Sequence, residues 1–294
     1  MIEITDKSLC CGCNACAQSC PKQCIEMLAD EEGFLYPFVD LSQCINCGLC
    51  TKVCPTINQD SPKEPLAVYA AKNKNESIRL NSSSGGIFTP LAEHIISECG
   101  VVFGAMFDDE WNVKHSYTET IEGLAKFRGS KYVQSTIGDS YSVAKKFLTE
   151  NRKVLFSGTP CQIAGLKKFL RKEYENLFTV EVVCHGVPSP KVWRDYLKYK
   201  QEDLAVKHEQ DKQIGLTKIT NISFRDKSNG WKKYSFRMEY SNQFQIQNNA
   251  DSTIDQNSTI EITPYKMDTY MAGFLKNLTL RPSCFLCAAR KGKS

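Results

Sequence analysis

The sequence predicts two folded parts: a small α+β head, and a larger α/β body whose mostly parallel sheet carries an antiparallel β insertion. Ten of the 15 cysteines lie within the first 54 residues, which sets the head apart. Strand and helix patterns alternate between residues 66 and 200, and two further strand patterns flank Asn229 and Gly230. The chain has 294 residues, 41% hydrophobic and 24% charged, a globular composition that excludes disordered and fibrous classes.

The head is expected at residues 1–57, a polar linker with two prolines at 58–65, and the body at 66–294. The first 60 residues hold three lysines and eight carboxylates, a net charge of −5, whereas the remainder carries +9. The basic residues of the body are scattered, so nucleic-acid binding is not expected. No apolar run reaches the roughly 18 residues of a membrane span, and no secretory signal precedes the head, which together predict a cytoplasmic protein.

Apolar periodicity places the elements of the body. Strands are expected at 68–71, 101–107, 153–157 and 178–183, and helices at 86–98, 139–149, 163–170 and 190–200. Residues 222–225 and 234–240 are predicted to be antiparallel strands, and the Asn/Gln/Ser/Thr-rich stretch 245–258 an exposed loop or hairpin.

Dense cysteines in a chain with a cytosolic character favour metal binding over disulfides. The head repeats one spacing, in which two residues separate each of three cysteines and three further residues precede a Cys-Pro pair: Cys10, Cys13, Cys16 and Cys20, then Cys44, Cys47, Cys50 and Cys54. Three such thiolates can bind one iron-sulfur cubane from a single loop, whereas the fourth ligates the other cubane.

This spacing resembles that of the bacterial two-cluster 4Fe-4S ferredoxin domain. The resemblance assigns Cys10, Cys13, Cys16 and Cys54 to one cluster, and Cys44, Cys47, Cys50 and Cys20 to the second. The competing prediction is zinc, which also binds four thiolates but normally through paired Cys-x-x-Cys knuckles. Cys11 and Cys24 lie outside the pattern and are expected to be small buried hydrophobic residues. A head of this kind transfers single electrons, and its acidic surface is expected to dock a redox partner protein.

The body holds a second group of cysteines. Cys161 and Cys184 each follow a predicted strand, at the edge where open α/β sheets bind ligands, and Cys284 and Cys287 form a Cys-x-x-Cys pair. These four predict a third 4Fe-4S cluster. The alternatives are a catalytic thiolate at Cys161, a redox pair at Cys284 and Cys287, or a purely structural role. Cys99, at the end of a helix pattern, is expected to be structural.

Four segments of the body, residues 157–166, 184–189, 223–227 and 280–284, resemble the beta subunit of coenzyme F420-reducing hydrogenase and dehydrogenase. The resemblance covers residues 66–294, and its most specific part is Gly158-Thr159-Pro160-Cys161-Gln162. It implies a flavin, an iron-sulfur cluster of the body's own, and electron exchange with a two-electron carrier such as coenzyme F420 or another organic substrate. It also implies that the body is incomplete at its C-terminus, because family members continue beyond the Cys-x-x-Cys segment.

Two segments are candidates for contacts with the flavin, expected as FAD. One precedes a predicted helix and offers free N–H groups to a pyrophosphate: Ser82, Ser83, Ser84, Gly85 and Gly86. The other pairs basic residues with Gly-Ser: Arg128, Gly129, Ser130, Lys131 and Tyr132. The competing interpretations are a simple helix cap for the first and a solvated basic turn for the second. No Gly-x-Gly-x-x-Gly motif is present.

The resulting prediction is an iron-sulfur flavin-dependent oxidoreductase that passes electrons between 4Fe-4S clusters and a flavin. No catalytic residue is singled out; His185 is a candidate for proton transfer or for tuning the third cluster, or else a buried structural histidine. Two alternatives remain open, an electron-transfer subunit without an active site of its own, and a reductase of a sugar-like or tetrapyrrole-like substrate.

Overall fold

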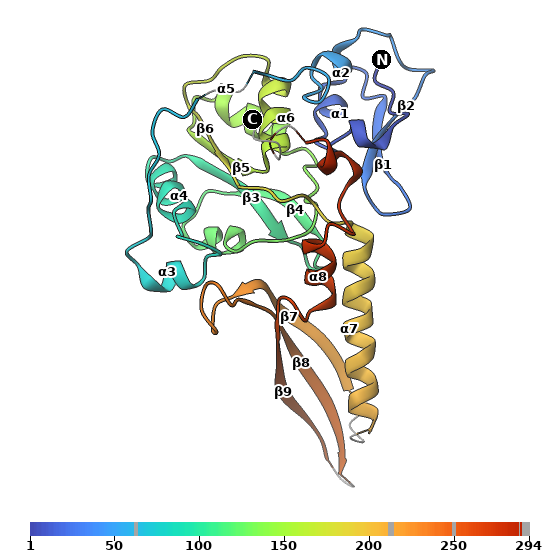
Figure 1. Ribbon diagram of the computed structural model, residues 1–294, viewed down its shortest axis with the longest axis vertical. Helices are drawn as coiled ribbons and strands as arrows, with labels where there is room; N and C mark the ends of the chain where they lie inside the picture. Colours follow the sequence, from blue (N-terminus) through green and yellow to red (C-terminus); the bar gives the residue numbers. More distant parts are fainter. Residues whose placement is uncertain (62–63, 211–214, 249–250, 288, 290–294) are drawn as a thin grey trace.

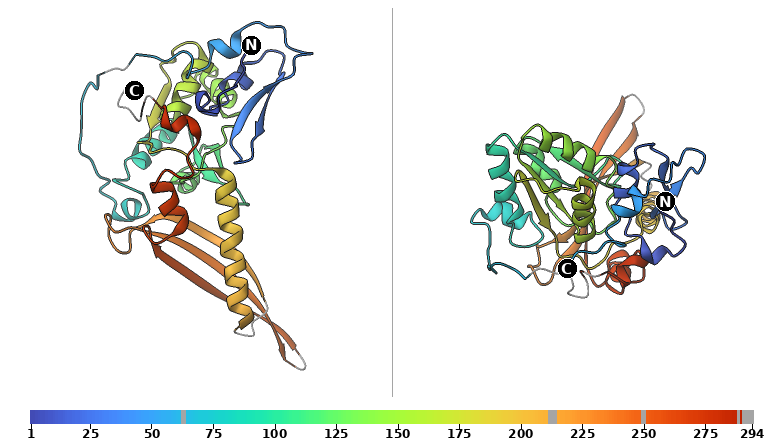
Figure 2. Two further views of the ribbon diagram at one scale, coloured as in Figure 1. Left: turned by 45° about the vertical axis from the view of Figure 1, so that its right-hand side comes forward. Right: turned by 90° about the horizontal axis from the view of Figure 1, so that it is seen from above.

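The computed structural model describes residues 1–61, 64–210, 215–248, 251–287 and 289. Figure 1 shows the head at one end of the molecule, a helix-covered sheet next to it, and a long three-stranded sheet at the far end. The turned views of Figure 2 keep the head against the body, with the long sheet directed away from both. The cysteine-rich segment is therefore packed onto the body rather than held apart from it.

The head is built around cysteines. It contains a β-hairpin and three short helical segments: η1 (Lys7–Leu9), α1 (Ala15–Ser19), β1 (Ile25–Ala29), β2 (Leu35–Val39) and α2 (Leu49–Lys52). Its buried core consists of Ile2, Ile25 and four cysteines, Cys16, Cys24, Cys50 and Cys54. Cysteines thus make up most of this buried cluster, and Ile4, Met27 and Val39 pack against it.

A mixed four-stranded sheet forms the centre of the body, in the order β4-β3-β5-β6. Its strands are β3 (Val101–Phe107), β4 (Val113–Thr118), β5 (Val154–Gly158) and β6 (Leu177–Glu181). The β3/β5 and β5/β6 pairs are parallel, and the β3/β4 pair is antiparallel. The expected mostly parallel arrangement therefore holds for two of these three pairs.

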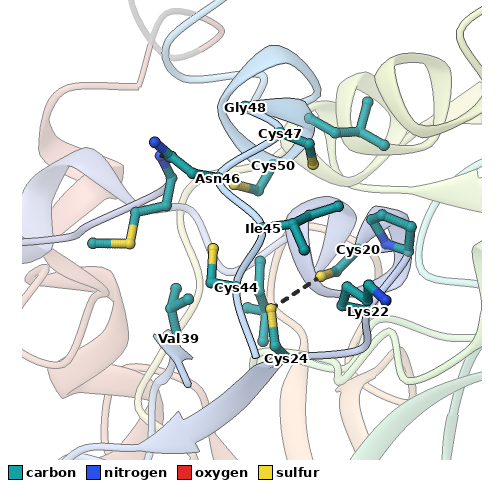
Figure 3. Close-up of a pocket in the computed structure, with 14 residues that line it drawn as sticks. Cys20, Lys22, Cys24, Val39, Cys44, Ile45, Asn46, Cys47, Gly48 and Cys50 are labelled. Atoms are coloured by element: carbon teal, nitrogen blue, oxygen red, sulfur yellow. Dashed lines mark hydrogen bonds between the residues drawn. The ribbon is translucent and has the colours of Figure 1, made fainter. Parts of the chain in front are cut away.

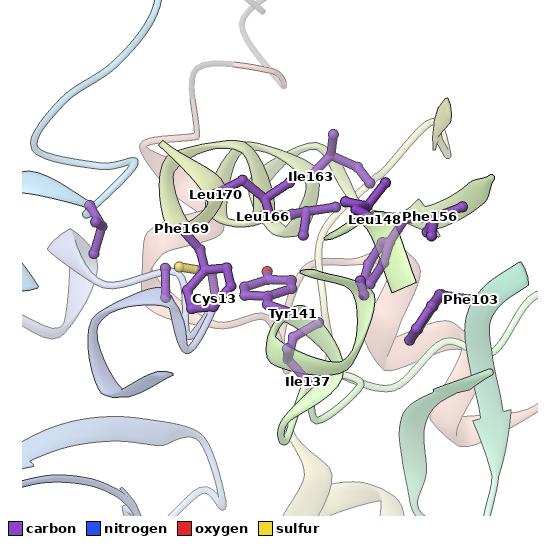
Figure 4. Close-up of a cluster of buried hydrophobic side chains, with 14 of the residues drawn as sticks. Cys13, Phe103, Ile137, Tyr141, Leu148, Phe156, Ile163, Leu166, Phe169 and Leu170 are labelled. Atoms are coloured by element: carbon purple, nitrogen blue, oxygen red, sulfur yellow. The ribbon is translucent and has the colours of Figure 1, made fainter. Parts of the chain in front are cut away.

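Alternating side chains of β3 and β5 face two different layers, as a strand period of two requires. On one face, Val102 and Leu155 pack against α4 (Phe88–Ser97) and η2 (Glu122–Phe127). On the other face, Phe103 and Phe156 pack with side chains of α5 (Ser140–Thr149) and α6 (Pro160–Leu170). Figure 4 shows that Cys13 of the head lies in this second layer, so the head docks on the α5/α6 side.

The third sheet is the antiparallel insertion. Its strands are β7 (Gly215–Asp226), β8 (Ser235–Asn248) and β9 (Asp251–Pro264), in the order β7-β8-β9. Aromatic side chains of α7 (Pro190–Gln210) and α8 (Thr269–Leu275) cover it, with Trp193 completely buried. The remaining short helical segments are α3 (Glu76–Leu80) and η3 (Pro282–Phe285). Among the described residues, no helix combines the length and the apolar character that crossing a membrane requires.

Several predicted elements need correction. Residues 68–71 do not form a strand: Val68 and Tyr69 are almost fully exposed, and no strand within the described part of the chain pairs with them. Helix α6 begins three residues earlier than expected, because Thr159 and Gln162 form a capping box ahead of it. The polar stretch 245–258 was expected to be an exposed loop or a hairpin. It belongs to the antiparallel β8/β9 pair, so the hairpin alternative is the one observed. Strand β4 was not predicted.

Candidate metal centre

The second predicted ligand set of the head lines a single small pocket. Cys20, Cys44, Cys47 and Cys50 all border it, together with Cys24 (Figure 3). Gly48 adopts a left-handed conformation just before α2, which turns the chain so that Cys47 and Cys50 reach the same space. The Ile2 amide donates a hydrogen bond to the Cys50 sulfur over 3.2 Å. The pocket has five thiols from two distant segments, the four predicted ligands and Cys24, and a backbone donor.

The first predicted ligand set is buried next to this pocket. Cys10, Cys13, Cys16 and Cys54 are all buried, and Cys16 interacts electrostatically with Cys10 and Cys54. The single turn of α1 separates Cys16 from Cys20 and directs Cys20 into the other pocket. Cys16 also interacts with Cys50 of the other set, so the two sets adjoin, and the crossed assignment of ligands that the resemblance implies stays a prediction.

The four body cysteines line one cavity between the head and the body. Cys161 lies in the first turn of α6, Cys184 follows β6 after three residues, Cys284 lies in η3, and Cys287 follows it. The Val187 amide donates to the Cys284 sulfur over 3.4 Å, and the Thr159 hydroxyl lies 3.2 Å from the Cys161 sulfur. Electrostatic interactions link Cys184 to Cys161, Cys284 and Cys287, so the four thiols act on one another within this cavity.

Burial makes these thiols poor acids in the absence of a cation. It raises the pKa of Cys16 and of Cys184 to about 12, and that of Cys284 to about 11. A buried thiolate is stable only when a positive charge compensates it, and a bound metal deprotonates its thiol ligands outright. Amides of Gly12, Ala17 and Gly186 also donate to Cys10, Cys16 and Cys184, the kind of contact that iron-sulfur clusters receive. The donor sets therefore fit iron-sulfur clusters.

Each thiolate of a cubane binds a different iron, so its ligand set is wider than that of a single ion. Within the part of the chain that the structure describes, no three His, Cys, Asp or Glu side chains gather tightly enough to hold one metal ion.

The two candidate flavin segments meet in the structure. The Ser130 amide donates to the Ser83 hydroxyl over 2.6 Å, and Arg128 Nε donates to Thr89 Oγ1 over 3.2 Å. Burial lowers the pKa of Lys131 to about 8, and its ammonium donates to the Arg128 carbonyl over 3.1 Å. Lys227 reaches the same place and donates to the Ser84 carbonyl over 3.1 Å. Cationic side chains thus gather around residues 82–86 and 128–132.

An aromatic contact chain connects this region with the body cysteines. The Tyr132 ring stacks on Phe274 at 4.8 Å, and Phe274 meets the edge of His185 at 5.1 Å. His185 is adjacent to Cys184 and lines the same cavity as the four body thiols. The two predicted cofactor regions are therefore in contact through Phe274.

Comparison with known families identifies both parts of the chain. Residues 151–292 match the family model for the C-terminal part of the coenzyme F420 hydrogenase/dehydrogenase beta subunit. Residues 9–58 and 40–103 match models of the 4Fe-4S dicluster domain. The chain is a relative of the F420 hydrogenase beta subunit with a 4Fe-4S dicluster head. Both matches agree with the family resemblance and the 4Fe-4S head that the sequence predicted.

One solved structure is similar to this F420 hydrogenase beta-subunit relative. A chain of the F420-reducing [NiFe] hydrogenase complex from Methanosarcina barkeri is similar at 17% identity and a TM-score of 0.40. The similarity covers 74% of this chain and 63% of that one. The comparison with curated proteins gives no match.

The surroundings of three residues in this beta-subunit relative escaped sequence reasoning. Cys11, expected to be a simple hydrophobic residue, hydrogen-bonds through its thiol to Cys161 and lines the body cavity. Cys24, expected to be the same, lies 3.4 Å from Cys20, sulfur to sulfur. Arg281 is completely buried between head and body. Its position within the Leu280-Arg281-Pro282-Ser283-Cys284 segment gave no sign of burial, since an arginine before a turn is usually solvated.

Proposed function

We propose that this chain passes electrons between the 4Fe-4S clusters of its head and a flavin in its body, through a third cluster held by Cys161, Cys184, Cys284 and Cys287. The observation that carries the proposal is the cavity between head and body, which all four of these thiols line. The flavin would exchange hydride with a two-electron carrier, coenzyme F420 or another organic substrate, and the chain would be a flavin-dependent oxidoreductase. A cytoplasmic location belongs to the same proposal.

Contact between the head and the body cavity supports the first step. Cys11 is next to Cys10 in sequence and hydrogen-bonds to Cys161, so one residue joins the first head site to the body site. Gln134 Nε2 donates to the Cys11 carbonyl over 3.1 Å and fixes the backbone there. Head and body ligands are thereby held in direct contact, which favours electron transfer between them.

The cationic region at residues 82–86 and 128–132 supports the second step. Ser83, Arg128, Lys131 and the N-terminus of α4 would bind the FAD pyrophosphate, since free amides and cations stabilise phosphate charge. A flavin, once bound, accepts a hydride and releases its two electrons one at a time. Tyr132, Phe274 and His185 would connect that site to the body cluster.

Electrons would enter or leave at the exposed end of the head. Cys47 is exposed, and it lies in the pocket that forms the second head site. Phe38, Leu41 and Ile45 are exposed on the head, each by more than half of its surface. Exposed apolar side chains on an acidic domain suit a basic redox partner protein, whose approach would be steered by charge attraction.

The test counts iron in variants purified without oxygen. Replacing Cys161 and Cys284 together by Ala should remove about four irons per chain, the content of one cubane, and leave the head clusters in place. Cys99→Ser is the matched control, because Cys99 is exposed and lies outside the three groups.

Loss of about four irons from the double variant, with none lost from the control, would support the third cluster. Unchanged iron in the double variant would reject it.

A further inference from the structure

Arg281 is a buried cation at the junction of head and body. Its side chain is completely buried, directly before η3. Nε donates to the Cys10 carbonyl over 2.7 Å, and Nη2 donates to the Leu35 carbonyl over 2.8 Å. Nη1 donates to Gln134 Oε1 over 2.9 Å. All three nitrogens of the guanidinium are therefore fixed by neutral groups.

No carboxylate balances this charge among the described residues. The guanidinium lies over the Tyr36 ring at 4.2 Å and near the Phe34 ring at 5.3 Å, so aromatic faces and carbonyl oxygens supply its surroundings. Buried charges in proteins are normally paired or bound to a metal site, because removing an ion from water is costly. A completely buried arginine without an anion implies that negative charge is supplied by something else nearby.

The thiols of two predicted clusters lie next to Arg281. Nη2 is 3.7 Å from the Cys10 sulfur, and Cys284 follows Arg281 by three residues. Arg281 also lines the body cavity together with Cys161 and Cys184. Its field therefore acts on the first head site and on the body site at once.

We propose that Arg281 is the fixed counter-charge of the electron path and raises the reduction potentials of the two clusters it adjoins, those at Cys10 and at Cys284. This inference rests on the proposed function, which places clusters at these thiols. One electron arriving from an external one-electron donor adds one negative charge to a cluster. A guanidinium already held in place stabilises that charge without reorganisation, and the surrounding low dielectric strengthens the effect.

The second head site lies farther along this path. Cys20, Cys44, Cys47 and Cys50 line a pocket that Arg281 does not border, and Cys47 is exposed. Solvent and distance weaken the field of Arg281 there. Arg281 therefore raises the potentials of the inner clusters more than that of the outer one, which favours electrons residing next to the body cavity.

The experiment is an anaerobic redox titration with dithionite, followed by electron paramagnetic resonance of each cluster, on the complete protein and its variants. Arg281→Met should lower the potential of the first head cluster by at least a tenfold change in its reduction equilibrium, about 59 mV for one electron. The outer cluster should shift less. Arg281→Lys retains the charge and should stay closer to the parent.

Gln134→Glu is the second variant and leaves Arg281 in place. It puts a carboxylate where Gln134 Oε1 now accepts from Nη1, so it pairs the guanidinium without removing it. The potential of the first cluster should fall in this variant too, even if Arg281→Met does not fold. Ser189→Ala is the matched control, because it removes a buried head–body hydrogen bond to the Glu32 carbonyl with no change of charge.

The outcomes separate the two proposals. Iron content and the number of resonance signals in the parent test whether the clusters exist, and a parent without iron would overturn both proposals. With the first cluster present, potentials that stay unchanged in both Gln134→Glu and any folded Arg281→Met protein would overturn the role of Arg281. A shift of equal size in Ser189→Ala would overturn it as well, since that result would reflect a loosened junction rather than charge.

Discussion

Gly12 illustrates how tightly single residues are constrained at the head–body junction. It has a left-handed φ of +71°, and a Cβ there would lie 2.8 Å from Arg281 Nη1 and 2.9 Å from Gln134 Nε2. Gly48 has nearly the same φ, +73°, but a Cβ there would meet nothing within 4 Å. The two loops share one backbone conformation, but only at Gly12 would a Cβ meet side chains of the body.

Comparison of Gly12→Ala with Gly48→Ala separates backbone strain from crowding. Both substitutions should destabilise the fold by roughly 1–2 kcal/mol, the usual cost of a left-handed non-glycine residue. Gly12→Ala should cost more, because it also displaces the buried Arg281 side chain. The measurement is the free energy of unfolding in urea for both variants, and equal losses would contradict the crowding at Gly12.

At the residue scale, sequence spacing predicted where the thiols gather but not what surrounds them. The repeated cysteine spacing is local, so the grouping of Cys44, Cys47 and Cys50 follows from a single loop. The contacts of Cys11 with Cys161 and of Arg281 with Cys10 join residues far apart in sequence. Such contacts depend on how the head docks, which no local pattern encodes.

His115 on strand β4 is a buried titratable residue of the central sheet. It takes no part in the proposed metal sites. It is 6% exposed, stacks on Phe156, and contacts the Ser135 hydroxyl and the Ser157 carbonyl. Burial lowers the pKa of His115 to about 4. The folded sheet therefore holds a neutral imidazole at neutral pH.

This burial predicts a loss of stability in mild acid. Between pH 6.5 and pH 4 the unfolded chain binds a proton at His115 that the folded chain does not, so stability falls as pH falls through this window. Between pH 7.5 and 5.5 the contribution should amount to about 1 kcal/mol. Urea unfolding of the parent and of His115→Gln at both pH values measures it, and identical pH dependence in the two proteins would rule it out.

At the element scale, strands with apolar sequences could be predicted, whereas strands with polar sequences were harder to recognise. The buried runs of β3 and β5 were predicted almost to the residue. In β4 the inward-facing position after Val113 is His115, which hides the alternation of buried and exposed residues. Strand β9 forms by pairing along the whole of β8, although its sequence is rich in Thr, Ser, Asn and Gln. Residues 68–71 had the apolar character of a strand but found no partner.

At the scale of the whole molecule, head and body share one core. Cys13, Ala15 and Val53 of the head pack in the same buried cluster as Tyr141 and Leu166 of the body. A Cβ at Gly165 of α6 would lie 2.8 Å from Cys13 Cβ, so this helix can approach the head loop only with glycine at that position. The sequence predicted the two parts as separate domains joined by a linker. In the structure their shared core holds the head sites against the cavity of the body cysteines.

The most direct measurement of this arrangement is the iron, acid-labile sulfide and flavin content of the complete protein purified without oxygen. We predict about twelve irons and about one flavin per chain, since three cubanes and one FAD form the proposed path. About eight irons without flavin would leave only the head clusters and contradict a reaction centre in the body, and zinc in place of iron would contradict the electron path itself.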